Sequence, residues 1–167
     1  MTNAPAIPVA LALGSNLGDR LDSLRQAIKA LAPYVEITAL SPVYETAPLY
    51  VTDQPAFLNA VVIGMTKLEP LALLWTAKDI ESEIGRTPTY RYGPRVIDID
   101  IILYGDKIVD TPELGIPHRR VAERDFVLHP LSDIAPEWRH PINGQTVAEM
   151  CALLPSNTVT SLGALLP

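Results

Sequence analysis

A strand that carries two carboxylates among apolar residues constrains this chain more than any other feature. The run from Val96 to Ile102 reads Val-Ile-Asp-Ile-Asp-Ile-Ile and follows the stiff turn Gly93-Pro94. Side chains alternate across a strand, so Asp98 and Asp100 share one face, with Cα atoms roughly 6.5–7 Å apart. The opposite face is expected to be apolar and to pack into a core, through Ile97, Ile99, Ile101 and Leu103.

The shared face needs a positive partner, because like charges on one face weaken a sheet. Magnesium prefers oxygen ligands from one or two carboxylates plus phosphates, and paired ions lie about 3.5–4 Å apart. Arg91 and Arg95, on either side of the Gly-Pro turn, suit phosphate oxygens. The run therefore predicts a site for magnesium and phosphate. The alternative is a solvated strand face with surface arginines.

Hydrophobic periodicity predicts the order βαββαβ around this strand. Such an order is typical of a ferredoxin-like α+β domain, in which helices pack on an antiparallel sheet. Two long loops, 45–55 and 86–94, are expected to be functional. The predicted elements are strands over 9–13, 35–44 (broken or edged at Pro42) and 57–66, helices over 21–31 (capped by Asp19) and 70–84 (ended by Gly85), and the acidic strand.

The 167 residues, 48% of them hydrophobic, suit one domain over 1–167. We expect a flexible N-terminus over 1–8 and a frayed tail over 155–167. After Tyr104 the chain is proline-rich and is predicted to be irregular to Pro136, with a last helix from Thr146 to Leu154.

Composition restricts the partners. The net charge of -6 argues against nucleic acid, and no apolar run approaches the ~20 residues of a membrane span. Met1 to Pro8 lack the pattern of a signal peptide, and Cys151 is the only cysteine, so we expect a cytoplasmic protein without an internal disulfide. Its partners should be small molecules, and we expect a monomer.

Three other segments are candidate sites, each with a simpler interpretation. The turn 14–18 (Gly-Ser-Asn-Leu-Gly) between a strand and a helix suits an anion, but also any tight turn. The cluster from His118 to Arg124 suits phosphate, or is a solvated charged loop. Asn59 offers a donor and an acceptor to a heterocycle, or is a polar group at a strand edge.

Taken together, these segments resemble the 6-hydroxymethyl-7,8-dihydropterin pyrophosphokinase (HPPK) family of folate synthesis. The resemblance rests on Arg91-x-Gly-Pro-Arg-x-x-Asp-Ile-Asp-Ile-Ile102, and on four further segments in the right order between Val9 and Leu154. These are 13–18 (LGSNLG), 44–46 (YET) with 53–59 (DQPAFLN), 116–118 (IPH) and 124–128 (RDFVL).

The resemblance implies that the terminal pyrophosphoryl group of ATP is transferred to the hydroxymethyl oxygen of the pterin, with release of AMP. It implies two Mg²⁺ ions held by Asp98 and Asp100. One ion would bridge the α- and β-phosphates of ATP and the other the β- and γ-phosphates.

The resemblance also implies roles for individual residues. Arg86 and Arg95 would act in catalysis beside the two aspartates. The residues expected at the nucleotide are Glu81, Arg86, Arg91, Arg95, His118 and Arg124. The residues expected at the pterin are Gly14, Thr46, Leu49, Phe57, Asn59, Tyr92 and Phe126. Three positions depart from the family pattern: Ala47, Pro88 and Tyr92.

Two other interpretations stay open at this point. One is a pterin or nucleotide binder without catalysis on the same fold, which would be expected to have lost Asp98, Asp100 or Arg95; all three are present. The other is an unrelated magnesium-dependent hydrolase that uses the two aspartates and has no need of Asn59 and Phe126.

Overall fold

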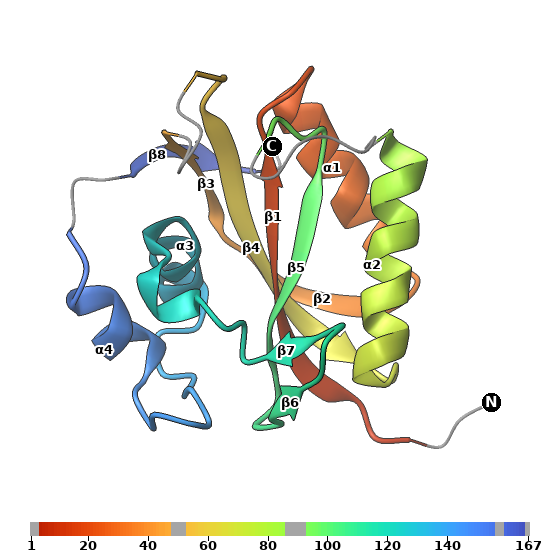
Figure 1. Cartoon of the computed structure of the whole chain (residues 1–167), viewed down its shortest axis with the longest axis vertical. Helices are drawn as coiled ribbons and strands as arrows, with labels where there is room; N and C mark the ends of the chain where they lie inside the picture. The colour runs from red at the N-terminus through yellow and green to blue at the C-terminus, as the bar shows by residue number, and fades with distance from the viewer. Residues whose placement is uncertain (1–3, 48–52, 86–92, 156–158, 166–167) are drawn as a thin grey trace.

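An antiparallel sheet with helices on both faces forms the body of the computed structural model, which describes residues 4–47, 53–85, 93–155 and 159–165 (Figure 1). The elements, in chain order, are β1 (Ile7–Ser15), α1 (Arg20–Leu31), β2 (Val35–Leu40), β3 (Pro42–Thr46), β4 (Phe57–Thr66), α2 (Pro70–Ile84), β5 (Asp98–Tyr104), β6 (Val109–Asp110), β7 (Gly115–Ile116), the 3₁₀ turn η1 (Val121–Glu123), α3 (Asp125–Ile134), α4 (Val147–Ala152) and β8 (Thr160–Ala164).

The sheet order places the last strand of the predicted core beside the first. Its strands run β5-β1-β4-β3-β8, and β2 also pairs with β4; each of these pairs is antiparallel. A small second sheet joins β6 and β7. The predicted α+β class, with helices packed on an antiparallel sheet, is confirmed.

Strand β1 is buried on both faces and divides the core into two layers. Val9, Leu11 and Leu13 face the layer that α1 and α2 cover. Ala10 and Ala12 face the layer that α3 and α4 cover. Figure 1 shows the two helix pairs on opposite sides of the sheet. Large residues on one face and small ones on the other leave room for a cavity on the α3 side.

The predicted helix ends agree with the structure. The Asp19 side chain accepts a hydrogen bond from Asp22 N at 3.1 Å and caps α1. Gly85 ends α2 in the left-handed conformation, with φ 117°. Thr146 caps α4 in a reciprocal arrangement with Glu149, so the last predicted helix is present but shorter.

The single strand predicted over 35–44 is two strands. β2 and β3 separate at Ser41, whose hydroxyl accepts a hydrogen bond from Val61 N and donates one to the carbonyl oxygen of Pro42, each at 2.8 Å. Both strands pair antiparallel with β4, as one continuous strand at this place would. After the break β3 pairs with the start of β4, where Tyr44 lies opposite Asn59 and Thr46 opposite Phe57.

Three predictions about the remaining backbone were wrong. The segment predicted to be irregular contains α3, which accommodates Pro130 inside a buried helix. The tail predicted to be frayed contains β8, which pairs with β3, and Leu165 beyond it is buried. The N-terminal segment predicted to be flexible already joins the sheet at Ile7, opposite Thr66.

A β-bulge changes the alternation along β5. The register against β1 shifts so that Ile101 is opposite Leu11 and Leu103 is opposite Ala10, with Ile102 as the extra residue. Leu103 therefore packs in the layer under α3, not with Ile99 and Ile101 as the alternation predicted. Asp98 and Asp100 precede the bulge and keep their shared face.

The longest described helix, α2, has 15 residues. No helix within the described ranges is long and apolar enough to cross a membrane. The single domain, the monomeric state and the cytoplasmic location stay predictions.

Gly64→Ala should destabilise the fold, because Gly64 lies under the β2 backbone. A Cβ there would lie 2.4 Å from Glu36 O and 2.7 Å from Val35 Cγ1. Backbone cannot move as a side chain can, so the free energy of unfolding in urea should fall by about 1–3 kcal/mol. Gly115→Ala is the comparison variant, since the three atoms nearest its Cβ, from 2.7 Å, belong to the exposed Arg119 side chain and not to backbone. An equal loss in both variants would contradict this explanation.

Candidate active site

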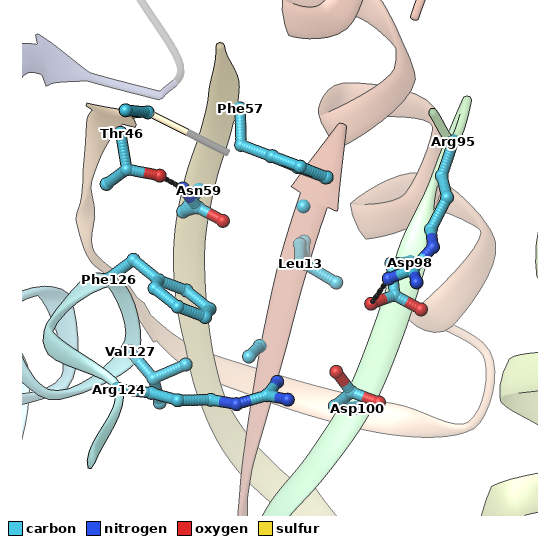
Figure 2. Close-up of a pocket in the computed structure, with 13 residues that line it drawn as sticks. Leu13, Thr46, Phe57, Asn59, Arg95, Asp98, Asp100, Arg124, Phe126 and Val127 are labelled. Atoms are coloured by element: carbon cyan, nitrogen blue, oxygen red, sulfur yellow. Dashed lines mark hydrogen bonds and ion pairs between the residues drawn. The ribbon is translucent and has the colours of Figure 1, made fainter. Parts of the chain in front are cut away.

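A pocket opens on the α3 side of the sheet, where β1, β4 and β5 lie side by side (Figure 2). It has a charged end and an end with an amide and aromatic rings. The charged end contains Arg95, Asp98, Asp100 and Arg124, and the other end contains Thr46, Ala47, Phe57, Asn59 and Phe126; Ala12, Leu13, Gly14 and Val127 complete the lining.

The two aspartates share a face, as predicted. Both line the pocket, while Ile99 between them is packed in the opposite layer. Burial and the neighbouring Asp98 charge raise the pKa of Asp100 well above its usual range, although Arg124 opposes the shift. The shift means that ionised Asp100 is costly in this buried position beside Asp98, unless a positive charge lies next to it. A cation at this end would remove that penalty.

Arg95 is held at its side chain and at its backbone. Its Nη1 lies 3.2 Å from Asp98 Oδ2. Its backbone N–H donates to Asn16 Oδ1 at 2.8 Å, and its carbonyl oxygen accepts from Asn16 N at 3.1 Å. The Arg95 backbone is therefore fixed by Asn16, and its guanidinium lies beside the acidic strand.

Asn16 also bonds to the segment that precedes β4. Its Nδ2 donates to Gln54 Oε1 at 2.9 Å and to the carbonyl oxygen of Pro55 at 3.1 Å. The side chain is fully buried. One amide thus joins the segment before β4 to the segment before β5. The sequence pattern placed Asn16 in a turn but gave it no role.

Asn59 presents its amide to the pocket. Its Nδ2 donates to Thr46 Oγ1 at 2.8 Å, and Figure 2 shows the amide oxygen directed toward the pocket. Gly14 lies opposite Asn59 on β4 and opposite Asp98 on β5. A Cβ on Gly14 would lie 3.2 Å from Asn59 Oδ1, so a glycine keeps this amide in place.

Arg124 and Phe126 close the pocket from the start of α3. The Arg124 guanidinium lies 5.5 Å from the centre of the Phe126 ring, within the range of a cation–π contact. Figure 2 shows the Arg124 side chain extending toward Asp100. The start of α3 thus provides both the Arg124 cation near Asp100 and the Phe126 ring near Asn59.

Glu81 does not line the pocket. It is buried on α2, and its Oε2 accepts a hydrogen bond from Ile99 N at 2.7 Å, on the side of β5 away from β1. The contact between Glu81 and a nucleotide stays a prediction, while its observed partner is the edge of the acidic strand.

His118 is also absent from the pocket lining. Its Nδ1 accepts a hydrogen bond from Arg120 N at 3.2 Å. Burial, and then the charge of Arg124, lower the pKa of His118 to about 4, so the ring is neutral at pH 7. The contact between His118 and a nucleotide stays a prediction.

The other predicted site residues divide into two groups. Gly14, Thr46, Phe57, Asn59, Arg95, Asp98, Asp100, Arg124 and Phe126 all line one pocket. Leu49, Arg86, Arg91 and Tyr92 lie outside the described residues, together with Pro88. Arg119, which belongs to the predicted cluster from His118 to Arg124, forms an ion pair with Asp110 of β6 at 2.9 Å.

Comparison with known proteins gives a consistent result. The model of the 7,8-dihydro-6-hydroxymethylpterin-pyrophosphokinase (HPPK) family matches residues 10–136. The 2-amino-4-hydroxy-6-hydroxymethyldihydropteridine pyrophosphokinase of Pseudomonas aeruginosa is 40% identical over 156 residues, which are 92% of this chain and 96% of that protein. The protein of the same name from Aquifex aeolicus is 41% identical, over 90% of this chain and 92% of its own length.

Longer proteins match as well. The mitochondrial folate synthesis bifunctional protein of Pisum sativum is 50% identical over 75% of this chain, but the chain spans only about a quarter, 25%, of its length. Among solved structures, a doubly substituted variant of Plasmodium falciparum HPPK-DHPS with pterin and p-hydroxybenzoate superposes with a TM-score of 0.74 at 17% identity, over 92% of this chain and 44% of that one. The last comparison concerns the fold alone.

Proposed function

The chain belongs to the 7,8-dihydro-6-hydroxymethylpterin-pyrophosphokinase family, and we propose that it transfers pyrophosphate from ATP to 6-hydroxymethyl-7,8-dihydropterin in folate synthesis. The hydroxymethyl oxygen would form a bond to the β-phosphorus and lose its proton. The bond from that phosphorus to the oxygen bridging to the α-phosphate would break, and AMP would leave with the electron pair. The products are AMP and the pterin diphosphate.

One observation supports this reaction more than any other: two different recognition chemistries face each other across a single pocket. Gly14 lies in register with both Asn59 and Asp98, so these two residues sit two strand spacings apart, roughly 10 Å between Cα atoms. A heterocycle at one end and phosphates at the other would bring their reacting atoms together over β1. Phosphoryl transfer depends mainly on such positioning and on charge neutralisation.

Asp98 and Asp100 would hold magnesium. Their carboxylates share the pocket face, and burial beside Asp98 raises the pKa of Asp100, so a bound cation would favour the ionised form. Among the described residues no group of three or more His, Cys, Asp or Glu forms a complete metal site. Two carboxylates without further protein ligands suit Mg²⁺, which commonly takes one or two carboxylates and completes its shell with phosphates and water. When bound, the metal would neutralise part of the phosphate charge.

Arg95 and Arg124 would bind the phosphate oxygens from the two sides of the aspartates. A guanidinium carries five N–H donors in a planar fork, so the ion pair between Arg95 and Asp98 leaves capacity for phosphate. The backbone bonds to Asn16 hold Arg95 in place before ATP arrives. Donors fixed in advance stabilise the charge that develops in the transition state without further reorganisation.

Asn59, Phe57 and Phe126 would select the pterin. An amide matches the paired donors and acceptors on a pterin edge, and aromatic walls suit its flat faces. Thr46 orients the Asn59 amide, which leaves the amide oxygen directed toward the pocket. This end also favours a transferase over an unrelated hydrolase, because a hydrolase acting through the aspartates has no need of it.

The direct test combines the protein with ATP, Mg²⁺ and hydroxymethyl-dihydropterin and measures AMP and the pterin diphosphate. We expect AMP only when the pterin is present. ADP and inorganic phosphate formed without pterin would indicate a hydrolase. Ligand binding without AMP would indicate a binder that lacks catalysis.

Asp98→Asn and Asp100→Asn should each abolish turnover while the far-UV circular dichroism spectrum stays native, because each replaces a charged carboxylate ligand by a neutral amide and relieves like-charge repulsion. Mn²⁺ binding, followed by electron paramagnetic resonance in the presence of a nonhydrolysable ATP analogue, should weaken in parallel. Asp106→Asn, in the exposed turn after β5, is the control and should change neither. If either pocket variant kept more than about a tenth of the activity, a loss of under ~1.4 kcal/mol, the metal assignment would be wrong.

Asn59→Ala should weaken pterin binding by about 1–3 kcal/mol, because a buried pterin edge would lose its hydrogen-bond partners. Nucleotide affinity should stay nearly constant, since Asn59 is at the other end of the pocket. Calorimetric titration with each ligand separates the two effects. Equal losses for both ligands would reduce Asn59 to a structural role.

Arg95→Ala should slow the chemical step more than it weakens ATP binding, because the guanidinium is placed to meet charge that moves during attack. Lysine should restore only part of the rate, since a point charge does not reproduce the planar fork. Single-turnover rates at saturating ATP, measured beside ATP affinity, distinguish the two roles. An unchanged rate with weakened affinity in the alanine variant would make Arg95 a binding residue only.

A further inference from the structure

Arg20 joins two backbone segments next to the pocket without lining it. It is the first residue of α1, and its Nη1 lies 2.9 Å from Glu45 Oε2 and 2.8 Å from the carbonyl oxygen of Ala56. The side chains of Arg20 and Glu45 are 30% and 39% exposed. A single nitrogen thus links the end of β3 to the residue just before β4.

These two contacts lie where the β3–β4 ladder ends. The last paired residues are Thr46 and Phe57, and both line the pocket. Glu45 immediately precedes Thr46, and Ala56 immediately precedes Phe57. Beyond this point no strand pairing holds the two segments together within the described residues. Arg20 therefore acts as one further cross-link at the open end of the ladder.

The cross-link lies next to two groups of the pocket in the chain. Thr46 Oγ1 orients the Asn59 amide, and the Phe57 ring forms a wall of the same end. If the two segments separated, the hydroxyl and the ring would move relative to each other. The amide oxygen that faces the pocket would then lose its fixed direction.

We propose that Arg20 is a positioning residue for the pterin end of the pocket, which sets the spacing of Thr46 and Phe57 through its bonds to Glu45 and Ala56; this inference rests on the proposed function. A partly exposed ion pair contributes little to global stability, so its main consequence is local geometry. Asn16 holds Gln54 and Pro55 independently, so loss of Arg20 loosens this end and leaves the fold in place.

The test compares Arg20→Met, Arg20→Lys and Glu45→Gln with wild type. Arg20→Met should raise the KM for hydroxymethyl-dihydropterin about three- to tenfold, change kcat less than about twofold and leave ATP affinity unchanged. Arg20→Lys and Glu45→Gln should have smaller effects, since each keeps part of the link. In Arg20→Met/Glu45→Gln, the effect on KM should not exceed that of Arg20→Met alone.

Arg25→Met is the matched control. Arg25 lies on the same helix and bonds to the carbonyl oxygen of Leu165 at 3.1 Å, so the variant removes the same charge away from the β3–β4 ladder. Its pterin KM should equal that of wild type. If Arg20→Met fails to fold, Glu45→Gln, which loses only the charge of one partner, decides the question by the same readouts.

The proposal would be overturned if the pterin KM stayed within about twofold of wild type in both Arg20→Met and Glu45→Gln. An equal rise in the KM values for pterin and ATP in Arg20→Met would overturn it as well. The proposed function would be unaffected by that result, because wild type and Arg25→Met would still release AMP in a pterin-dependent reaction. No pterin-dependent AMP from wild type would overturn the function and this role together.

Discussion

The register of β1 between β4 and β5 is the constraint on which the rest of the site depends. Gly14 sits opposite Asn59 on one side and Asp98 on the other, and Ala12 sits opposite Asp100. A shift of β1 by one residue would turn Ala12 into the α1–α2 layer and bring the large Leu11 and Leu13 side chains onto the pocket face. The alternation of large and small residues along β1 opposes such a shift, because only the face with Ala12 and Gly14 has room for a ligand. Packing in the core thus fixes the separation of the two ends of the pocket.

Much of the fold could be predicted from local sequence patterns. The two periodic helices had a cap at Asp19 and a stop at Gly85, which are local signals and were confirmed. α3 was missed because Pro130 usually interrupts a helix, while here it lies in a buried layer. β8 was missed because its residues are exposed and show no alternation, so that its pairing with β3 depends on a strand more than a hundred residues earlier.

The site was predictable where chemistry and alternation coincide. Asp98 and Asp100 share a face because the pleat of a strand requires it, and their segment is read directly from the sequence. The face predicted for Leu103 was wrong, because a bulge interrupts the alternation before it. The bulge depends on how β1 and β5 pair, which the sequence of one strand does not reveal. Asn16 was overlooked for a similar reason: its partners lie 38 to 79 residues away in the chain. Local patterns identify the chemical groups, and tertiary pairing decides which of them meet.

The hydrogen bond from Ile99 N to Glu81 has a consequence for the behaviour of the protein in solution. β5 is the outermost strand on its side of the sheet, so its outward N–H groups are a template for pairing with another chain. A buried carboxylate already occupies one of those donors at 2.7 Å, and helix α2, which carries it, packs against the strand. At the other edge, β8 covers β3. The acidic strand can therefore remain open to ligands on its face while its edge resists aggregation.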